Sequence, residues 1–128
     1  MSGQPLDPLA SLPDELPAPA DDGAASHLEG SALPEIVLSS TEGPVRLRDL
    51  PSLTVLFVYP SIGMDPTRLD DWTAIPGARG CTPEACGFRD ELAAFRRAGA
   101  EVVGLSSQPL DQQREAVERL GLQYPLVS

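Results

Sequence analysis

The sequence predicts a single α/β domain built on a parallel sheet, and three observations support this prediction. Two near-continuous apolar runs, at residues 53–59 and 101–106, are typical of strands buried on both faces of a parallel sheet. An amphipathic pattern at residues 82–98 lies between them, and a second one follows at residues 109–120. A strand, a helix and a strand in this order imply a right-handed crossover. The 128 residues, 41% of them hydrophobic, suffice for one modest core.

A short hairpin is expected before the first of these strands. Residues 35–40 and 45–47 are extended in character and flank the turn signal Glu42-Gly43-Pro44. The strand at residues 53–59 then ends at Pro60. The stretch from there to Gly80 is too long and irregular for a simple connection, and loops of this length are usually functional or mobile.

Each helix has recognisable ends. Thr82 is a good N-cap for the first helix, Pro83 suits its first helical position, and Gly99 ends it near residue 98. The second helix, from Pro109 to Leu120, stops at Gly121. Its apolar residues keep to one side: Leu110, Val117 and Leu120. With the hairpin in front, this order is that of a thioredoxin-like α/β domain.

Residues 1–30 are predicted to form an arm outside the domain, which spans residues 31–128. The arm holds six acids, no base and five prolines, and shows no sustained hydrophobic period. This composition is typical of a disordered or loosely docked segment. Because the arm carries a charge of −6, it accounts for most of the net charge of −10.

The composition argues against several kinds of partner. An acidic chain without a cluster of basic residues is a poor match for nucleic acid, because that affinity depends on cations that neutralise phosphates. The longest apolar runs, near residues 53–59, are far too short to span a membrane. The first residues lack the cationic and apolar regions of a secretory signal. We therefore expect a cytoplasmic protein without a membrane or nucleic-acid partner.

The two cysteines of the chain, Cys81 and Cys86, lie where the long loop gives way to the first helix. At a helix start, free amide N–H groups and the helix dipole favour a negative charge. A free thiol is only about 3% ionised at pH 7, and a helix start can lower its pKa enough to make the thiolate the major form. Cys81 is therefore the candidate nucleophile.

Cys86 has a different predicted place. Projection at 100° per residue puts Cys81 close to the apolar face of the helix and Cys86 almost opposite that face. If the helix reaches back to Cys81, the two Cα atoms are about 8.6 Å apart, beyond the roughly 7 Å limit for a disulfide. A bond between the two sulfurs then requires the first turn to unwind. Such a pair can react in sequence.

The stretch Cys81-Thr-Pro-Glu-Ala-Cys86-Gly-Phe-Arg-Asp90 resembles the peroxidatic and resolving cysteines, and the helix that carries them, of the atypical two-cysteine peroxiredoxins of the bacterioferritin-comigratory, or Q, type. The resemblance covers about residues 33–128. It implies that Cys81 attacks a peroxide and becomes a sulfenic acid, and that Cys86 then closes an intramolecular disulfide. It also implies a peroxide substrate, thioredoxin or a similar dithiol protein as reductant, and no metal or organic cofactor.

The sequence departs from that family in two ways. The family places a hydroxyl residue three positions before its peroxidatic cysteine, where this sequence has Ala78. It places a proline seven positions before that cysteine, where this sequence has Ala74. The hydroxyl groups that can replace the missing one are those of Thr73, Thr67 and Ser61. The closing strands, the final helix and the active-site Arg of the family have no counterpart before Ser128, and the nearby substitutes for that Arg are Arg79 and Arg89.

Plainer interpretations compete with redox catalysis. Two cysteines can simply be small buried hydrophobes. A metal site is not expected, because it needs about four ligands and the one imidazole, His27, lies in the arm. A thioredoxin-type dithiol has two residues between its cysteines rather than four, so thiol–disulfide exchange is less favoured than peroxide reduction.

Glu84 is expected only to complement the helix start, and Trp72 to anchor the loop or shape the entrance to the site.

Two alternatives to a complete peroxidase remain open. The first is a non-enzymatic redox-sensing or scaffold module that keeps the fold and the cysteines. The second is that the 128 residues are a piece of a longer enzyme.

Overall fold

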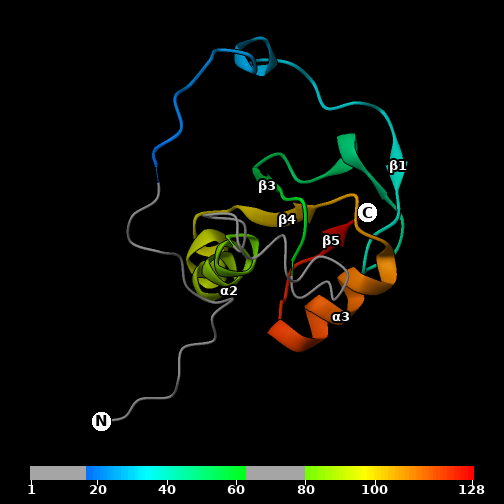
Figure 1. Ribbon diagram of the computed structural model, residues 1–128. Helices are drawn as coiled ribbons and strands as arrows, with labels where there is room; N and C mark the ends of the chain where they lie inside the picture. Colours follow the sequence, from blue (N-terminus) through cyan, green and yellow to red (C-terminus); the bar gives the residue numbers. More distant parts are fainter. Residues whose placement is uncertain (1–16, 63–79) are drawn as a thin grey trace.

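The computed structural model describes residues 17–62 and 80–128. Figure 1 shows the order of the elements, which are η1 (Ser26–Leu28), β1 (Val37–Leu38), β2 (Val45–Arg46), η2 (Leu47–Asp49), β3 (Thr54–Val58), α2 (Cys81–Arg97), β4 (Glu101–Leu105), α3 (Leu110–Leu120) and β5 (Leu126–Val127). The expectations for the long loop fall outside the described residues, namely those for Thr67, Trp72, Thr73, Ala74, Ala78 and Arg79.

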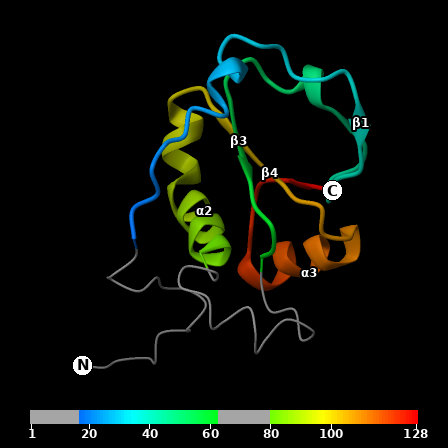
Figure 2. The ribbon, with the colours of Figure 1, turned by 45° about the horizontal axis from the view of Figure 1, so that its top comes forward.

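Three parallel strands form the central sheet, in the order β3-β4-β5. β3 and β4 pair from Thr54↔Glu101 to Val58↔Leu105, and β4 pairs with β5 from Gly104↔Leu126. The chain crosses from β3 to β4 through α2 and from β4 to β5 through α3 (Figures 1 and 2). The expected parallel crossover is confirmed, and the α/β fold is thioredoxin-like, as are the known structures that resemble it. β5 is a strand that the sequence analysis did not anticipate.

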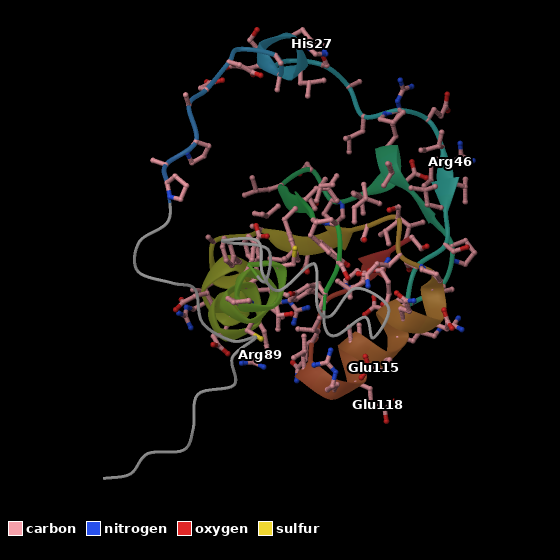
Figure 3. All side chains as sticks on the ribbon, in the orientation of Figure 1. His27, Arg46, Arg89, Glu115 and Glu118 are labelled. Atoms are coloured by element: carbon pink, nitrogen blue, oxygen red, sulfur yellow. The ribbon has the colours of Figure 1, made fainter. Side chains whose placement is uncertain are left out.

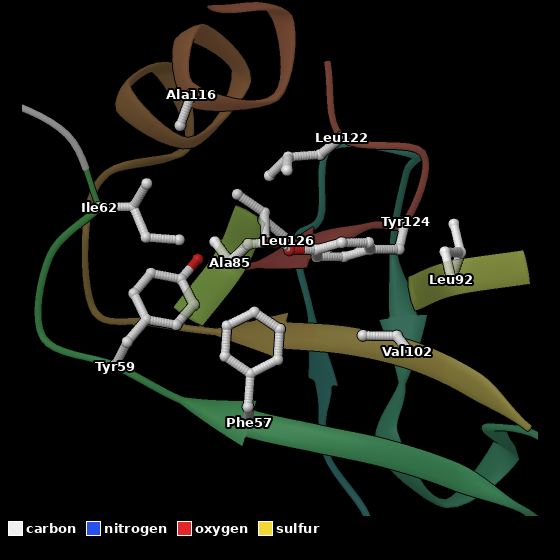
Figure 4. Close-up of a cluster of buried hydrophobic side chains, with 10 residues drawn as sticks. All are labelled: Phe57, Tyr59, Ile62, Ala85, Leu92, Val102, Ala116, Leu122, Tyr124 and Leu126. Atoms are coloured by element: carbon white, nitrogen blue, oxygen red, sulfur yellow. Dashed lines mark hydrogen bonds between the residues drawn. The ribbon is translucent and has the colours of Figure 1, made fainter. Parts of the chain in front are cut away.

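The core lies between one face of this sheet and the two helices. Its buried members come from β3, α2, β4, α3 and β5 and the segments beside them (Figure 4): Phe57, Tyr59, Ile62, Ala85, Leu92, Val102, Ala116, Leu122, Tyr124 and Leu126. Four aromatic rings meet here, because Phe57 stacks on Phe88 with centroids 4.6 Å apart and also lies near Tyr59 and Tyr124. This cluster joins α2 to β3 and to the segment just before β5.

β3 corrects one expectation, because it is not buried on both faces. Phe57 points to the helices and is 6% exposed, whereas Val58 on the opposite face is 70% exposed. Both helices pack on the same side of the sheet, so the alternate residues of this outer strand face away from them. β4 is buried as predicted.

α3 also differs in its buried face. Gly121 ends it in the left-handed conformation at φ 64°, as predicted from its C-terminal glycine. Its fully buried residues, however, are Gln113 and Ala116, whereas Val117 and Leu120 are only partly buried. The sequence pattern placed no polar residue inside, so the buried Gln113 is a finding of the structure.

The expected hairpin is present but short, with Val37 opposite Arg46 and Leu38 opposite Val45. The chain just after β1 then reaches the outer edge of β5. Ser40 bridges to Val127, and the N–H of Ser128 donates to the carbonyl of Ser39 at 2.8 Å.

Residues 17–36 are exposed throughout. The boundary at residue 30 between an arm and a domain stays a prediction. Among the described residues, no helix is both long and apolar enough to cross a bilayer.

Candidate active site

α2 begins two residues earlier than the capping pattern of the sequence indicated, and this places Cys81 inside the helix. The N-cap is Gly80 rather than Thr82, and no side chain caps the helix there. The first helical hydrogen bond runs from the N–H of Glu84 to the carbonyl of Gly80, at 3.0 Å. Pro83 still fits, because amides in the first turn have no partner within the helix. Thr82 is buried in that turn.

Both cysteines are half-buried free thiols. Cys81 packs against the hydrophobic core, as the helical projection predicted. Cys86 lies on another side of the helix, close enough to Arg89 and Tyr124 to interact with them electrostatically. The sulfurs therefore start in different surroundings, within one regular helix.

Opposing groups act on the Cys81 sulfur. Burial raises the pKa of the thiol, and the Glu84 carboxylate raises it further. The backbone N–H groups of Ser61 and of Cys81 itself donate toward the sulfur and lower the pKa. Burial outweighs the amides, so the pKa lies above its ordinary value, and the lowering expected from the helix start is not found. Glu84 therefore does more than complement the helix, because it opposes the thiolate.

A buried glutamine holds the backbone beside Ser61 in place. The Gln108 carboxamide accepts a hydrogen bond from the N–H of Ile62 at 2.9 Å and donates one to the carbonyl of Ile62 at 3.4 Å. Ser106 adds a bond of 3.3 Å to the carbonyl of Pro60. Residues 60–62 are thus tied to the end of β4, which fixes the Ser61 amide near Cys81. Of the hydroxyl candidates, only Ser61 lies in the described residues, and it is its amide that contacts the sulfur.

Tyr59 completes the buried side of the site. Its hydroxyl donates to the Gln113 carboxamide, which in turn donates to the carbonyl of Val127 at 2.7 Å. The pKa of Tyr59 is raised by burial first, then by Tyr124 and Cys81. Tyr59 is therefore a neutral phenol near the Cys81 sulfur at all ordinary pH values.

Residues 72–128 match the AhpC/TSA family. Over 127 residues the chain is 32% identical to the chloroplastic peroxiredoxin Q of Gentiana triflora, which is 94% of this chain and 52% of that protein. Residues 72–128 thus carry the AhpC/TSA match, and the relatives that resemble the whole chain include peroxiredoxins of the Q type. Peroxiredoxin bcp1 of Schizosaccharomyces pombe is 30% identical over 123 residues, covering 92% of this chain and 56% of that protein.

Solved structures of the family share the fold. Peroxidoxin BcpB from Mycobacterium tuberculosis matches with a TM-score of 0.60 and 35% identity, over 77% of this chain and 57% of that one. Xanthomonas campestris peroxiredoxin Q gives a TM-score of 0.57 and 26% identity, over 73% of this chain and 51% of that one. The chain thus spans about half the length of the AhpC/TSA relatives it matches.

Arg89 does not take the place of the active-site Arg of the AhpC/TSA family. Its guanidinium pairs with Asp90 at 2.9 Å and donates to the carbonyl of Leu120 at 2.8 Å (Figure 3 labels this side chain). It interacts with Cys86 rather than with Cys81. Arg79, the other candidate, lies outside the described residues.

No metal site is formed by the described residues, since no three of their His, Cys, Asp and Glu side chains cluster. The chemistry available here is that of the thiols, the amides and the phenols.

We expect Glu84→Gln to speed the alkylation of Cys81. The exposed carboxylate raises the pKa of the thiol, so its removal lowers that pKa and increases the thiolate fraction near neutral pH. The rate of reaction with iodoacetamide, measured in a Cys86→Ser background, should rise about twofold, as expected for a partly screened surface charge. The rate profile should move to lower pH. Glu91→Gln, on the exposed face of the same helix, is the matched control, and an equal change in both variants would contradict the assignment.

Sequence reasoning missed four residues around the cysteines: Tyr59, Gln108, Gln113 and Tyr124. Both glutamines read as ordinary polar positions near or within an amphipathic helix, and only the fold shows that they are buried. Tyr59 and Tyr124 carried a weak signal, because buried tyrosines usually need a partner for the hydroxyl.

Proposed function

We propose that the chain is the peroxide-reducing part of a thiol peroxidase, with Cys81 as its nucleophile. The observation that carries the proposal is the position of Cys81 in the first turn of α2, with the amides of Ser61 and Cys81 directed at its sulfur. Amide N–H groups stabilise a thiolate and the negative charge that moves through the site during the reaction. Peroxiredoxin relatives of the Q type support the assignment.

In the proposed reaction the Cys81 thiolate attacks one oxygen of a peroxide and breaks the O–O bond. The other oxygen leaves with a proton as water or an alcohol, and Cys81 becomes a sulfenic acid. The Cys86 thiolate then attacks the Cys81 sulfur, which releases water and forms a disulfide. Hydrogen peroxide and organic hydroperoxides both fit this step, and a solved relative from Xanthomonas campestris is described by its alkyl peroxide reduction activity.

A dithiol protein, thioredoxin or similar, is proposed to return the disulfide to two thiols. The cytoplasmic setting expected from the sequence is part of the same proposal, because both thiols must be regenerated for turnover. No organic cofactor enters any step.

The test is a stopped-flow reaction of the reduced protein with one equivalent of hydrogen peroxide, followed through Trp72 fluorescence. Two thiols should be lost per peroxide, and NADPH should be consumed when thioredoxin and its reductase are added. A reduced protein that keeps both thiols after exposure to peroxide would overturn the proposal.

The second candidate is a redox-sensing module that reacts once and is recycled slowly. The raised pKa of Cys81 favours it, because a thiol that is mostly protonated reacts slowly. Stoichiometric oxidation without sustained NADPH consumption would select this function.

A further inference from the structure

Three side-chain hydrogen bonds tie α2 to the end of α3 and to the segment that leads from it to β5. Arg89 donates to the carbonyl of Leu120 at 2.8 Å, and Arg96 donates to that of Gln123 at 3.0 Å. The third runs in the other direction, from the Tyr124 hydroxyl to the carbonyl of Ala85 at 2.6 Å. Only this third bond reaches the part of the helix between the two cysteines.

The hydrogen bond from Tyr124 to Ala85 is buried, and its donor is held by packing on the sheet side. Tyr124 is 1% exposed and Ala85 is fully buried. The Tyr124 ring meets Phe57 edge-on with centroids 5.9 Å apart, and points toward Ala85 (Figure 4). The next residue, Pro125, accepts a hydrogen bond from the N–H of Gly104 in β4 at 3.1 Å. The hydroxyl is therefore held from the sheet side and does not follow the helix if the helix moves.

The helix has to move for the proposed disulfide to form. Cys81 and Cys86 both lie within α2, so their Cα atoms are about 8.6 Å apart by helical geometry. A disulfide needs roughly 7 Å or less. Closing that gap rearranges the backbone between the cysteines, and the carbonyl of Ala85 is part of that backbone.

We propose that Tyr124 is a positioning residue that holds the stretch of α2 between the two cysteines in its helical form through the Ala85 carbonyl, and so sets the rate at which Cys86 closes on Cys81. Only the biological use of this closure step rests on the proposed function. The effect of Tyr124 on the helix concerns the two thiols and holds for any reaction that joins them.

The electrostatics around Tyr124 agree with this role. Burial raises the pKa of its phenol, and the neighbouring Cys86 raises it further. The hydroxyl therefore keeps its proton and remains a donor to Ala85.

The test variant is Tyr124→Phe, which keeps the ring against Phe57 and removes only the hydroxyl. The carbonyl of Ala85 is not left without a hydrogen bond, because its oxygen has a second lone pair that can accept one within the helix. Loss of one buried neutral hydrogen bond should make closure about three- to tenfold faster.

Closure can be measured without peroxide. One equivalent of dithiobis(nitrobenzoate) reacts with the first thiol and releases one thionitrobenzoate, leaving a mixed disulfide on the protein. The second thiol then attacks the protein sulfur and displaces the second thionitrobenzoate. The rate of this second release reports closure, and it should be faster in Tyr124→Phe. Amide exchange in the reduced protein should also quicken between Thr82 and Phe88.

Arg96→Gln is the matched control, since it removes a tie of the same kind from a later turn of α2. Its second release should keep the wild-type rate. Equal rates in wild type and Tyr124→Phe, or equal acceleration in both variants, would overturn the inference. A measurement on the wild-type protein guards against a variant that fails to fold: with ring-labelled tyrosine, the NMR signal of Tyr124 should move on oxidation, and an unmoved signal would also overturn it.

A peroxide arm separates the two proposals. With hydrogen peroxide, Tyr124→Phe should form the sulfenic acid at the wild-type rate and lose it faster. If peroxide oxidises neither protein while the second release is still accelerated, the proposed function fails and the role of Tyr124 stands.

Discussion

Cys81→Ser should abolish peroxide reduction, whereas Cys86→Ser should keep a single turnover and accumulate a sulfenic acid on Cys81. The amides of Ser61 and of the helix start are directed at the Cys81 sulfur, so Cys81 is the thiol placed to become the reacting thiolate. Loss of a nucleophile typically lowers a rate by about 10³-fold or more. Stopped-flow mixing with hydrogen peroxide gives the rate, and trapping with dimedone followed by mass spectrometry locates the sulfenic acid.

The two serine variants control each other, because each removes one sulfur from the same helix. A dimedone adduct on Cys86 in the Cys81→Ser protein, with none on Cys81 in the reciprocal variant, would reverse the two roles. Mixing the variants in equal amounts should give no rapid turnover if the disulfide forms within one chain.

Gly104→Ala is expected to destabilise the protein by about 1–3 kcal/mol, the usual cost of overpacking a core. Gly104 lies in β4 between Phe57 and Leu126 on the neighbouring strands. A Cβ there would stand 2.6 Å from Leu126 and 3.0 Å from both Phe57 and Tyr59. The backbone entropy gained by replacing glycine, about 0.4–1 kcal/mol, is too small to offset this. Urea unfolding measures the free energy directly.

Gly87→Ala is the control for this prediction. Gly87 lies in α2, and a Cβ there meets nothing within 4 Å. Alanine should therefore raise the free energy of unfolding by about 0.5–1 kcal/mol, as in other helix interiors. A Gly104→Ala protein as stable as wild type would show that close packing does not require a glycine at this position.

The order of elements was predictable because it follows from patterns that are local in sequence. The apolar runs at residues 53–59 and 101–106 and the amphipathic stretch between them fix a parallel crossover, and the structure has it. The placement of Cys81 against the core was predictable for the same reason, since helical periodicity needs no knowledge of the neighbours.

The rest depends on contacts between residues far apart in the sequence. α2 starts two residues before the predicted N-cap, since Gly80 accepts the first helical hydrogen bond and Thr82 is buried within the first turn. The pKa of Cys81 is raised because the fold buries the thiol more than the helix start compensates. No local pattern shows that Gln108 reaches Ile62, a residue 46 positions earlier. The exposed Val58 follows from both helices covering one face.

The register of the sheet also bears on how the chain reaches this structure. Thr54 pairs with Glu101 across 47 positions, whereas Gly104 pairs with Leu126 across only 22. Closing the longer loop costs about 0.7 kcal/mol more in chain entropy, so β4, α3 and β5 are the elements that can assemble first. Tyr124 belongs to that early unit. The start of α2, with its two thiols, would then dock onto a surface already formed, and the cysteines would become protected after β4, α3 and β5 during refolding.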